Sequence, residues 1–297
     1  MSLEFLISKI QNNNFLLIGR AGVDIYPDPP GTKTENANTY VTHLGGSSAN
    51  MGVQLVKYGG SCSLLTRVSN DALGKFALNQ LDHYGVNRDL VKLEDNESRI
   101  SFAIVETTIE DHQSIIYRHK AADLFLNKSD IENAKIHNYE CILITGTSLA
   151  AQPSRDAVLY ALKLAKEHNI PVIMDIDYRP YTWESAEKAK DVYNLACDYC
   201  SGVIGNDDEF AILSGNYDEG LNYAKKLSSK CDLVIFKMGE KGSITFSQNL
   251  EIIKGIFPVK PLKPTGAGDS FMGSLIGALL KNYDLEKAIE IGSAAAA

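Results

Sequence analysis

Apolar runs alternate with helical patterns through the C-terminal two thirds of the chain. Short apolar runs at 141–145, 171–175, 202–204 and 233–237 are typical of strands buried on both faces. Between them, apolar residues recur at helical spacing over 154–167, 184–199 and 217–227. Repeated strand–helix–strand units predict an α/β fold with a mainly parallel central sheet and helices on both faces.

The N-terminal part has a different pattern. Residues 15–22 begin as a buried strand, whereas 39–44, 100–107 and 114–119 are rich in strand-forming residues with no helical pattern of their own. We therefore predict a small antiparallel β lid, formed by about 31–45 and 98–122 within a single domain of 1–297. Such flaps often close over ligands.

Composition and charge restrict the classes of partner. The chain has 297 residues, of which 44% are hydrophobic and 22% charged, as in ordinary globular proteins. Its net charge of −8 argues against nucleic acid and anionic membranes as partners, because both require clustered Lys and Arg. Residues 1–14 lack the pattern of a secretion signal, and no apolar run reaches the length of a membrane span, so we expect a cytoplasmic protein.

The five cysteines are scattered along the chain, and their number is odd. This suits reduced thiols in a cytoplasm. Cys197 and Cys200 form a C-x-x-C motif, but no second pair and no neighbouring histidine accompany it. The motif is therefore a weak indication of a metal or redox site.

Residues 263–273, KPTGAGDSFMG, predict a tight loop that opens a helix. The first N–H groups of a helix have no intrahelical acceptor, and the helix dipole adds positive charge, so such a loop can hold an anion. Asp269 would repel an anion if it were only a ligand, but it suits a base that accepts the proton of an attacking hydroxyl. An ordinary helix cap remains the alternative for this motif on its own.

A second glycine turn, Gly45-Gly46, leads into a helical pattern at 49–58, and Asp24 follows the first predicted strand. With the GAGD sequence, these residues resemble the ribokinase-like (PfkB) carbohydrate kinase family over essentially the whole chain. The resemblance implies a three-layer α/β/α kinase fold and ATP-dependent phosphorylation of a sugar's primary hydroxyl. It also implies roles for particular residues: Gly266, Ala267 and Gly268 as the anion hole, Asp269 as the base, and Asp24, Gly45, Gly46 and Asn50 as ligands of the sugar hydroxyls.

The resemblance extends to the nucleotide and metal sites. Asn206-Asp207-Asp208-Glu209 resembles the family's Asn-x-x-Glu motif, in which Glu209 would bind Mg²⁺ mainly through water. An ordinary capping box is the other interpretation of this motif, and both can hold together. The segment 237–243 resembles the family's nucleotide loop, although by itself it would be an ordinary hairpin. The expected ATP ligands are Asn206, Lys237, Gly239, Gly242 and Thr265.

Two arginines indicate the class of sugar. Arg118 and Arg179 lie where kinases of acidic keto-sugars carry arginines that hold the substrate carboxylate, and the planar guanidinium suits that group. Structural salt bridges are the alternative role. Residues 19–27 and Lys263 resemble the branch that phosphorylates 5-dehydro-2-deoxygluconate in myo-inositol catabolism. Lys263 stands where most members carry an Asp that helps to bind a monovalent cation, so we expect no activation by potassium.

Other functions remain open from the sequence. A 2-keto-3-deoxygluconate kinase is the nearest alternative, followed by a neutral-sugar kinase such as a fructokinase or ribokinase. A sugar-binding regulator without catalysis is an alternative from a different functional class, since proteins of one fold can have different functions. Finally, the exposed edges expected for the lid favour a homodimer that pairs through it.

Overall fold

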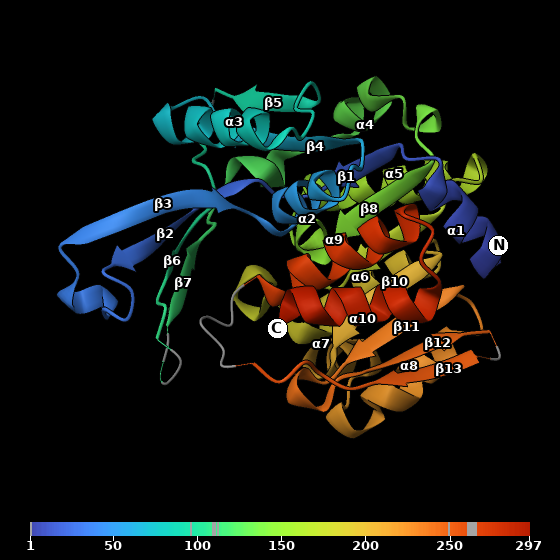
Figure 1. Cartoon of the computed structure of the whole chain (residues 1–297). Helices are drawn as coiled ribbons and strands as arrows, with labels where there is room; N and C mark the ends of the chain where they lie inside the picture. The colour runs from blue at the N-terminus through green and yellow to red at the C-terminus, as the bar shows by residue number, and fades with distance from the viewer. Residues whose placement is uncertain (1, 96, 109–110, 112, 249, 260–265) are drawn as a thin grey trace.

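The computed structural model describes all residues except 1, 96, 109–110, 112, 249 and 260–265 (Figure 1). Its main feature is a nine-stranded sheet in the order β13-β12-β11-β10-β9-β8-β1-β4-β5. Neighbouring strands are parallel except at β11–β12 and β12–β13. The expected mainly parallel sheet is confirmed. The strands are β1 (Phe15–Ile18), β4 (Cys62–Ser69), β5 (Val91–Glu94), β8 (Cys141–Thr145), β9 (Val172–Asp175), β10 (Gly202–Asn206), β11 (Leu233–Lys237), β12 (Ser243–Ser247) and β13 (Leu250–Lys254).

Helices cover both faces of this sheet. One apolar core joins it to α4–α8, and a second joins it to α1–α3, α9 and α10. The three layers thus agree with the expected α/β/α arrangement. The helices are α1 (Leu3–Gln11), α2 (Ser47–Lys57), α3 (Ala72–Tyr84), α4 (Lys128–Ala134), α5 (Ser154–Glu167), α6 (Ala186–Cys197), α7 (Asp207–Ser214), α8 (Gly220–Leu227), α9 (Ala267–Leu280) and α10 (Leu285–Ala296).

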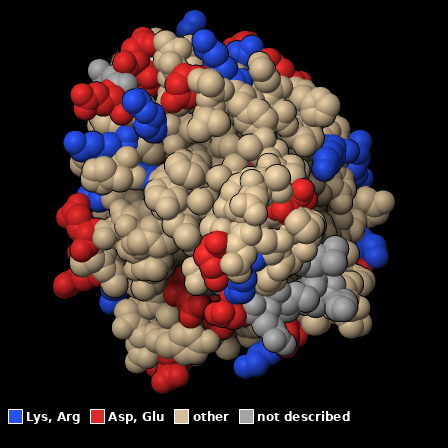
Figure 2. Space-filling view, turned by 90° about the vertical axis from the view of Figure 1, so that its left-hand side faces the viewer, with Lys and Arg blue, Asp and Glu red and all other residues tan. Residues whose placement is uncertain are grey.

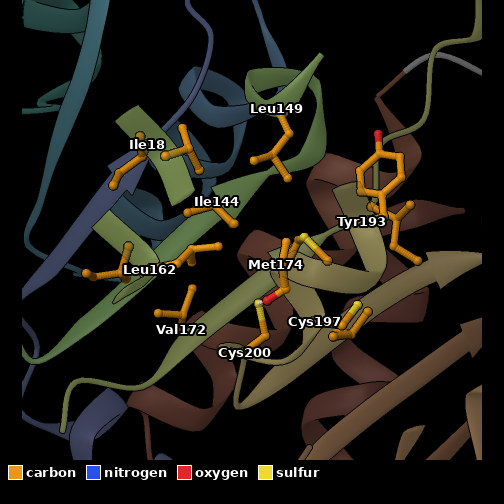
Figure 3. Packing of buried hydrophobic residues seen from close by; sticks show 14 of the residues in the cluster. Ile18, Ile144, Leu149, Leu162, Val172, Met174, Tyr193, Cys197 and Cys200 are labelled. Atoms are coloured by element: carbon orange, nitrogen blue, oxygen red, sulfur yellow. Dashed lines mark hydrogen bonds between the residues drawn. The ribbon is translucent and has the colours of Figure 1, made fainter. Parts of the chain in front are cut away.

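Strand β8 shows why the strands are continuously apolar in sequence. Ile142 and Ile144 pack in the core of α4–α8, whereas Cys141 and Leu143 point into the other core. Because successive side chains of a strand face opposite sides, a strand covered on both faces needs apolar residues at every position. Figure 3 shows Ile144 close to Ile18, Leu162 and Met174 in the first of these cores.

A separate four-stranded sheet, which we call the lid, projects from one end of the large sheet (Figure 1). Its strand order is β3-β2-β6-β7, with β2–β3 and β6–β7 antiparallel and β2–β6 parallel. The lid is formed by β2 (Gly22–Asp28), β3 (Thr39–Gly45), β6 (Phe102–Val105) and β7 (Ser114–Tyr117). The predicted lid ranges left out β2, because the chain leaves the large sheet after Ile18 and enters the lid only four residues later.

Three further observations concern membrane spans, cysteines and metal-binding groups. Over the described ranges, no helix is long and apolar enough to cross a membrane. All five cysteines are buried and free, including the Cys197–Cys200 pair at the end of α6. The same described residues contain no group of three or more His, Cys, Asp or Glu side chains that could hold a metal ion.

Candidate active site

A cavity of about 930 Å³ lies where the lid meets the carboxyl ends of the parallel strands. Open α/β sheets bind their ligands at this edge, where loops from several strands converge. The walls come from the lid, from the loop after β9, from the ends of β10 and β11, and from the N-termini of α2 and α9. The lining residues include Asp24, Gly46, Asn50, Asp175, Asp177, Arg179, Asn206, Glu209, Lys237, Gly239, Gly242, Gly266, Ala267, Gly268 and Asp269.

Asp269 lies in the first turn of α9, after Gly266 with a φ of +90°. Asn50, 219 residues earlier and on α2, donates from Nδ2 to Oδ2 of Asp269 at 2.8 Å. The residue that precedes the helix is Gly266, which makes no side-chain capping bond, so Asp269 is not the N-cap of α9. Burial and the nearby charge of Asp177 raise the pKa of Asp269 to about 7, although the bond from Asn50 opposes the shift.

Glu209 forms the capping box considered for its motif and also lines the cavity. Its backbone N–H donates to Oδ1 of Asn206 at 2.8 Å, and its Oε2 accepts from Asn206 N at 2.8 Å, so the two residues form a capping box at the start of α7. Its Oε1 accepts from Tyr178 N at 3.1 Å. Burial, followed by the charge of Asp175, raises the pKa of Glu209 to about 7. The same carboxyl therefore caps a helix and lines the cavity.

Lys237, the last residue of β11, places a partly buried ammonium among these carboxyl groups. Its Nζ lies 4.0 Å from Oδ1 of Asp175. Burial alone would lower the pKa of Lys237, but Asp175 and Glu209 hold it above its ordinary value, so the ammonium stays charged. A Cβ built on Gly268 would lie 3.4 Å from Nζ, which places this positive charge beside the Gly266–Gly268 loop.

The second glycine turn brings the lid and α2 together. Gly46 has a φ of +95°, and a Cβ there would lie 2.4 Å from the backbone oxygen of Arg20. A Cβ on Gly45 would lie 2.1 Å from Oδ1 of Asp24. Gly46 and Asp24 line the cavity, whereas Gly45 is not among the described lining residues but supports Asp24 from behind.

The two arginines expected at the substrate carboxylate occupy different environments. Arg179 lines the cavity, and its Nη2 lies 2.7 Å from Oδ1 of Asp177. Arg118 is buried, donates from Nη1 to the oxygen of Thr147 at 2.9 Å, and pairs through Nε and Nη2 with Asp123. Arg118 is not among the described residues that line the cavity. Its ion pair with Asp123 is a structural salt bridge, which is the alternative role that the sequence left open.

Some residues of the cavity were not singled out from the sequence. Arg20, Ser47, Asp177 and Tyr181 all line it. Arg20 lies just after the carboxyl end of the first buried strand. This position in the sequence could have identified it as a candidate site residue. Ile256, Phe257 and Val259 form an apolar wall that no motif or periodic pattern in the sequence indicated. Thr265 and Lys263 lie outside the described residues.

Comparisons with known proteins agree with this geometry. The sequence profile of the pfkB family carbohydrate kinases matches residues 12–297. The chain belongs to this family. It is therefore an ATP-dependent carbohydrate kinase, as the motifs predict. It is 36% identical to a 5-dehydro-2-deoxygluconokinase of Photobacterium profundum, over 95% of this chain and 87% of the relative. It is 32% identical to a protein of the same name from Bacillus subtilis, over 95% and 88% of the two chains.

Solved structures support the fold. A putative ribokinase II from E. coli superposes with a TM-score of 0.85 at 21% identity, covering 96% of this chain and 92% of the other. A Vibrio cholerae fructokinase double mutant with fructose, ADP and potassium bound superposes with a TM-score of 0.82 at 26% identity, covering 96% and 90%. These similarities confirm the ribokinase-like α/β fold.

Proposed function

We propose that this kinase transfers the γ-phosphoryl group of ATP to the primary hydroxyl of an acidic keto-deoxy sugar, 5-dehydro-2-deoxy-D-gluconate. The observation that carries the proposal is that one cavity contains both a partly buried carboxyl group suited to be a base, Asp269, and a cationic end with Arg179. The names of the relatives at 31–36% identity support this choice of sugar.

Asp269 acts as the general base for the sugar hydroxyl. A base is most effective when its pKa lies near the working pH, and the pKa of Asp269 is raised to about 7. The bond from Asn50 fixes the orientation of the carboxylate, while Asp24 and Gly46 bind other hydroxyls of the sugar. The attacking oxygen bonds to the γ-phosphorus as the bond to the bridging oxygen of ADP breaks, and its proton passes to Asp269.

Positive charge in the same cavity stabilises the transferred phosphoryl group. The first N–H groups of α9, at Ala267 and Gly268, have no intrahelical acceptors, and the Lys237 ammonium lies beside them. We propose that Asn206, Gly239, Gly242 and Thr265 bind the nucleotide, with the apolar wall of Ile256, Phe257 and Val259 beside it.

The carboxyl groups of the cavity fit a magnesium ion. Glu209 and Asp175 offer oxygen atoms, which Mg²⁺ prefers, and the size of the cavity leaves room for the waters that Mg²⁺ retains. We propose that Glu209 holds the ion through water. When bound, Mg²⁺ neutralises charge on the phosphate oxygens of ATP.

The arrangement of the whole chain supports three further proposals. Residues 1–297 act as one kinase unit, in which the lid closes the sugar end of the cavity. The enzyme works in the cytoplasm, in keeping with its five free, buried thiols. It forms a homodimer through the lid, a proposal argued in the Discussion.

A screen of sugars with coupled detection of ADP tests the proposed function. 5-Dehydro-2-deoxygluconate, 2-keto-3-deoxygluconate, fructose and ribose are each offered with ATP and Mg²⁺, and the phosphorylated carbon is identified by NMR. We expect the highest kcat/KM for 5-dehydro-2-deoxygluconate, with the phosphate on its primary hydroxyl. A higher kcat/KM for any of the others contradicts the proposed substrate, and sugar-independent ADP release alone contradicts a sugar kinase.

A further inference from the structure

Arg20 lies in the connection between β1 and β2, where the chain passes from the large sheet into the lid. Its backbone oxygen accepts a hydrogen bond from Ala49 N at 3.2 Å. The close approach of Gly46 to the same oxygen leaves no room for a side chain. These contacts with α2 fix the backbone of Arg20, and its side chain lines the cavity.

Arg20 differs from Arg118 and Arg179 in its ion pairing with the described residues. Arg118 pairs with Asp123, and Arg179 pairs with Asp177. Arg20 is only 8% exposed, and it forms no ion pair within 4.0 Å with the residues that the structure describes. The charge of Arg20 helps to lower the pKa of Asp177, but Arg179 is the residue that pairs with that carboxylate. A counter-charge from a ligand would therefore stabilise the largely buried guanidinium of Arg20.

The hydrogen bonds of Arg20 to the described residues leave part of its guanidinium without a protein acceptor. Its Nη1 donates to Oγ of Ser101 at 2.9 Å, whereas its buried Nε meets no acceptor within the described part of the chain. Arg67 uses its Nε and Nη2 to hold Asp130, at 2.8 and 3.2 Å, and Arg118 holds Asp123 by the same two atoms. In Arg20, no carboxylate of a described residue lies within ion-pair distance of the Nε–Nη2 edge that binds a carboxylate in those two pairs.

The N-terminus of α2 adds positive potential at the same place. The helix starts at Ser47, directly after Gly46, and no side chain caps its first N–H groups. Gly46 and Ser47 both line the cavity next to Arg20. The beginning of an 11-residue helix favours an anion, as a guanidinium does.

We propose that Arg20 is the residue that selects acidic sugars, because it binds the substrate carboxylate at the lid end of the cavity. This inference rests on the proposed function. It gives Arg20 the part that the sequence motifs assign to Arg118, whose guanidinium is already engaged by Asp123. Arg179 supports the same end of the cavity with a charge that Asp177 partly balances.

The test compares an acid with its neutral counterpart. kcat/KM is measured for 5-dehydro-2-deoxygluconate and for its primary amide, which keeps the hydroxyl groups and lacks the charge. The variants are Arg20→Gln, Arg20→Lys, Arg118→Gln and the control Arg155→Gln. Arg155 is as deeply buried as Arg20, at 6% exposed, but it donates to the backbone oxygens of Leu149 and Ala150. The ratio of the two kcat/KM values is independent of how much of a variant is folded.

We expect Arg20→Gln to lower the acid-to-amide ratio about 10- to 100-fold, as loss of a charge-assisted hydrogen-bonded pair would do. Arg20→Lys should restore part of the ratio, because a lysine keeps the charge without the planar fork. Arg118→Gln and Arg155→Gln should keep the wild-type ratio. A wild-type acid-to-amide ratio in Arg20→Gln, or a lowered ratio in Arg118→Gln only, overturns the role of Arg20 but not the proposed function. A wild-type enzyme that does not prefer the acid overturns the proposed function as well.

Discussion

At the scale of single residues, two properties of Asp269 suit the proposed general base. Asn50 holds its carboxylate by a hydrogen bond, and its pKa is raised to about 7. Replacing Asp269 with Asn keeps the size of the side chain but removes the proton acceptor. We expect Asp269→Asn to lower kcat about 10²- to 10⁴-fold, while the KM values for ATP and sugar change little. Steady-state kinetics on both substrates measures this. Asp208→Asn, a change at an exposed carboxylate in the first turn of α7, is the control. Turnover near the wild-type rate in Asp269→Asn would rule out the assignment.

We expect Asn50 to affect the pH dependence of kcat/KM through its hydrogen bond to Asp269. Because the pKa of Asp269 is raised to about 7, kcat/KM should fall as the pH drops through that value and the base becomes protonated. The hydrogen bond from Asn50 lowers this pKa, so Asn50→Ala should move the acid limb of the profile to higher pH. The pKa of Asp269 is also shifted by the charges of Asp175, Asp177 and Arg179. The acid limb of the profile therefore reports the titration of this interacting cluster and not of Asp269 alone.

A pH–rate profile of Asn50→Ala beside the wild type measures this shift. Gln54→Ala is a matched control, because Gln54 lies one turn further along α2 and donates to Oγ of Ser274 rather than to Asp269. An acid limb that stays in place in Asn50→Ala would show that the bond to Asp269 does not tune the base.

At the scale of elements, the active site depends on the close packing of α2 against α9. A Cβ on Gly273 would lie 2.7 Å from Cβ of Gln54, and one on Gly277 would lie 2.4 Å from Cγ of Tyr58. Two glycines on one face of α9 therefore let the helices approach. The Asn50–Asp269 bond crosses the same interface, so its length depends on this spacing.

We expect Gly273→Ala to separate the two helices and to destabilise the protein by about 1–3 kcal/mol, the usual effect of overpacking. It should also lower kcat/KM, because Asn50 loses its bond to Asp269. Thermal unfolding and steady-state kinetics measure the two effects. Gly255→Ala, where nothing lies within 4 Å of the added Cβ, is the control. A Gly273→Ala enzyme with wild-type stability would show that the interface can adjust.

The elements differ in how well local sequence predicts them. Helix α5 spans the residues expected from its apolar spacing, because an amphipathic helix at the surface of a sheet carries that pattern along its whole length. The sequence pattern did not separate strand β2 from β1, because only Gly19–Ala21 lie between them. The expected helix over 217–227 begins as a short 3-10 turn, Tyr217–Glu219, and becomes α-helical at Gly220.

At the scale of the whole molecule, short motifs located the strand ends and glycine turns of the active site, but not their mutual contacts. Asp269, Asn50, Glu209 and Lys237 lie far apart in the chain and meet only through the parallel order of the sheet. The partner of an arginine is also a long-range property. The sequence does not distinguish Arg118 from Arg20 in this respect. The fold shows that Arg118 is ion-paired with Asp123, whereas Arg20 forms no ion pair within 4.0 Å with a described residue.

The outer face of the lid carries the exposed side chains on which the proposed homodimer rests. Ser114 and Ile116 of β7 line the cavity, so the alternating Ile115 and Tyr117 point to the opposite face. Their exposed fractions are 36% and 50%, and Tyr40 of β3 is 40% exposed. Seen from the lid side, the middle of the surface is mostly uncharged (Figure 2). Exposed apolar side chains on a small sheet favour burial against a second copy.

We expect a dimer at micromolar concentration, measured by light scattering after size-exclusion chromatography. Tyr117→Lys should shift the mass towards the monomer, because a buried ammonium without a partner opposes association. Ile253→Lys, at a residue 67% exposed on the edge strand β13 of the large sheet, should leave the dimer intact. Dissociation should also raise the KM for the sugar more than that for ATP, since the lid lines the end of the cavity where we propose that the sugar binds. A wild-type monomer, or a Tyr117→Lys variant that remains dimeric, would show that the outer face of the lid is not the interface.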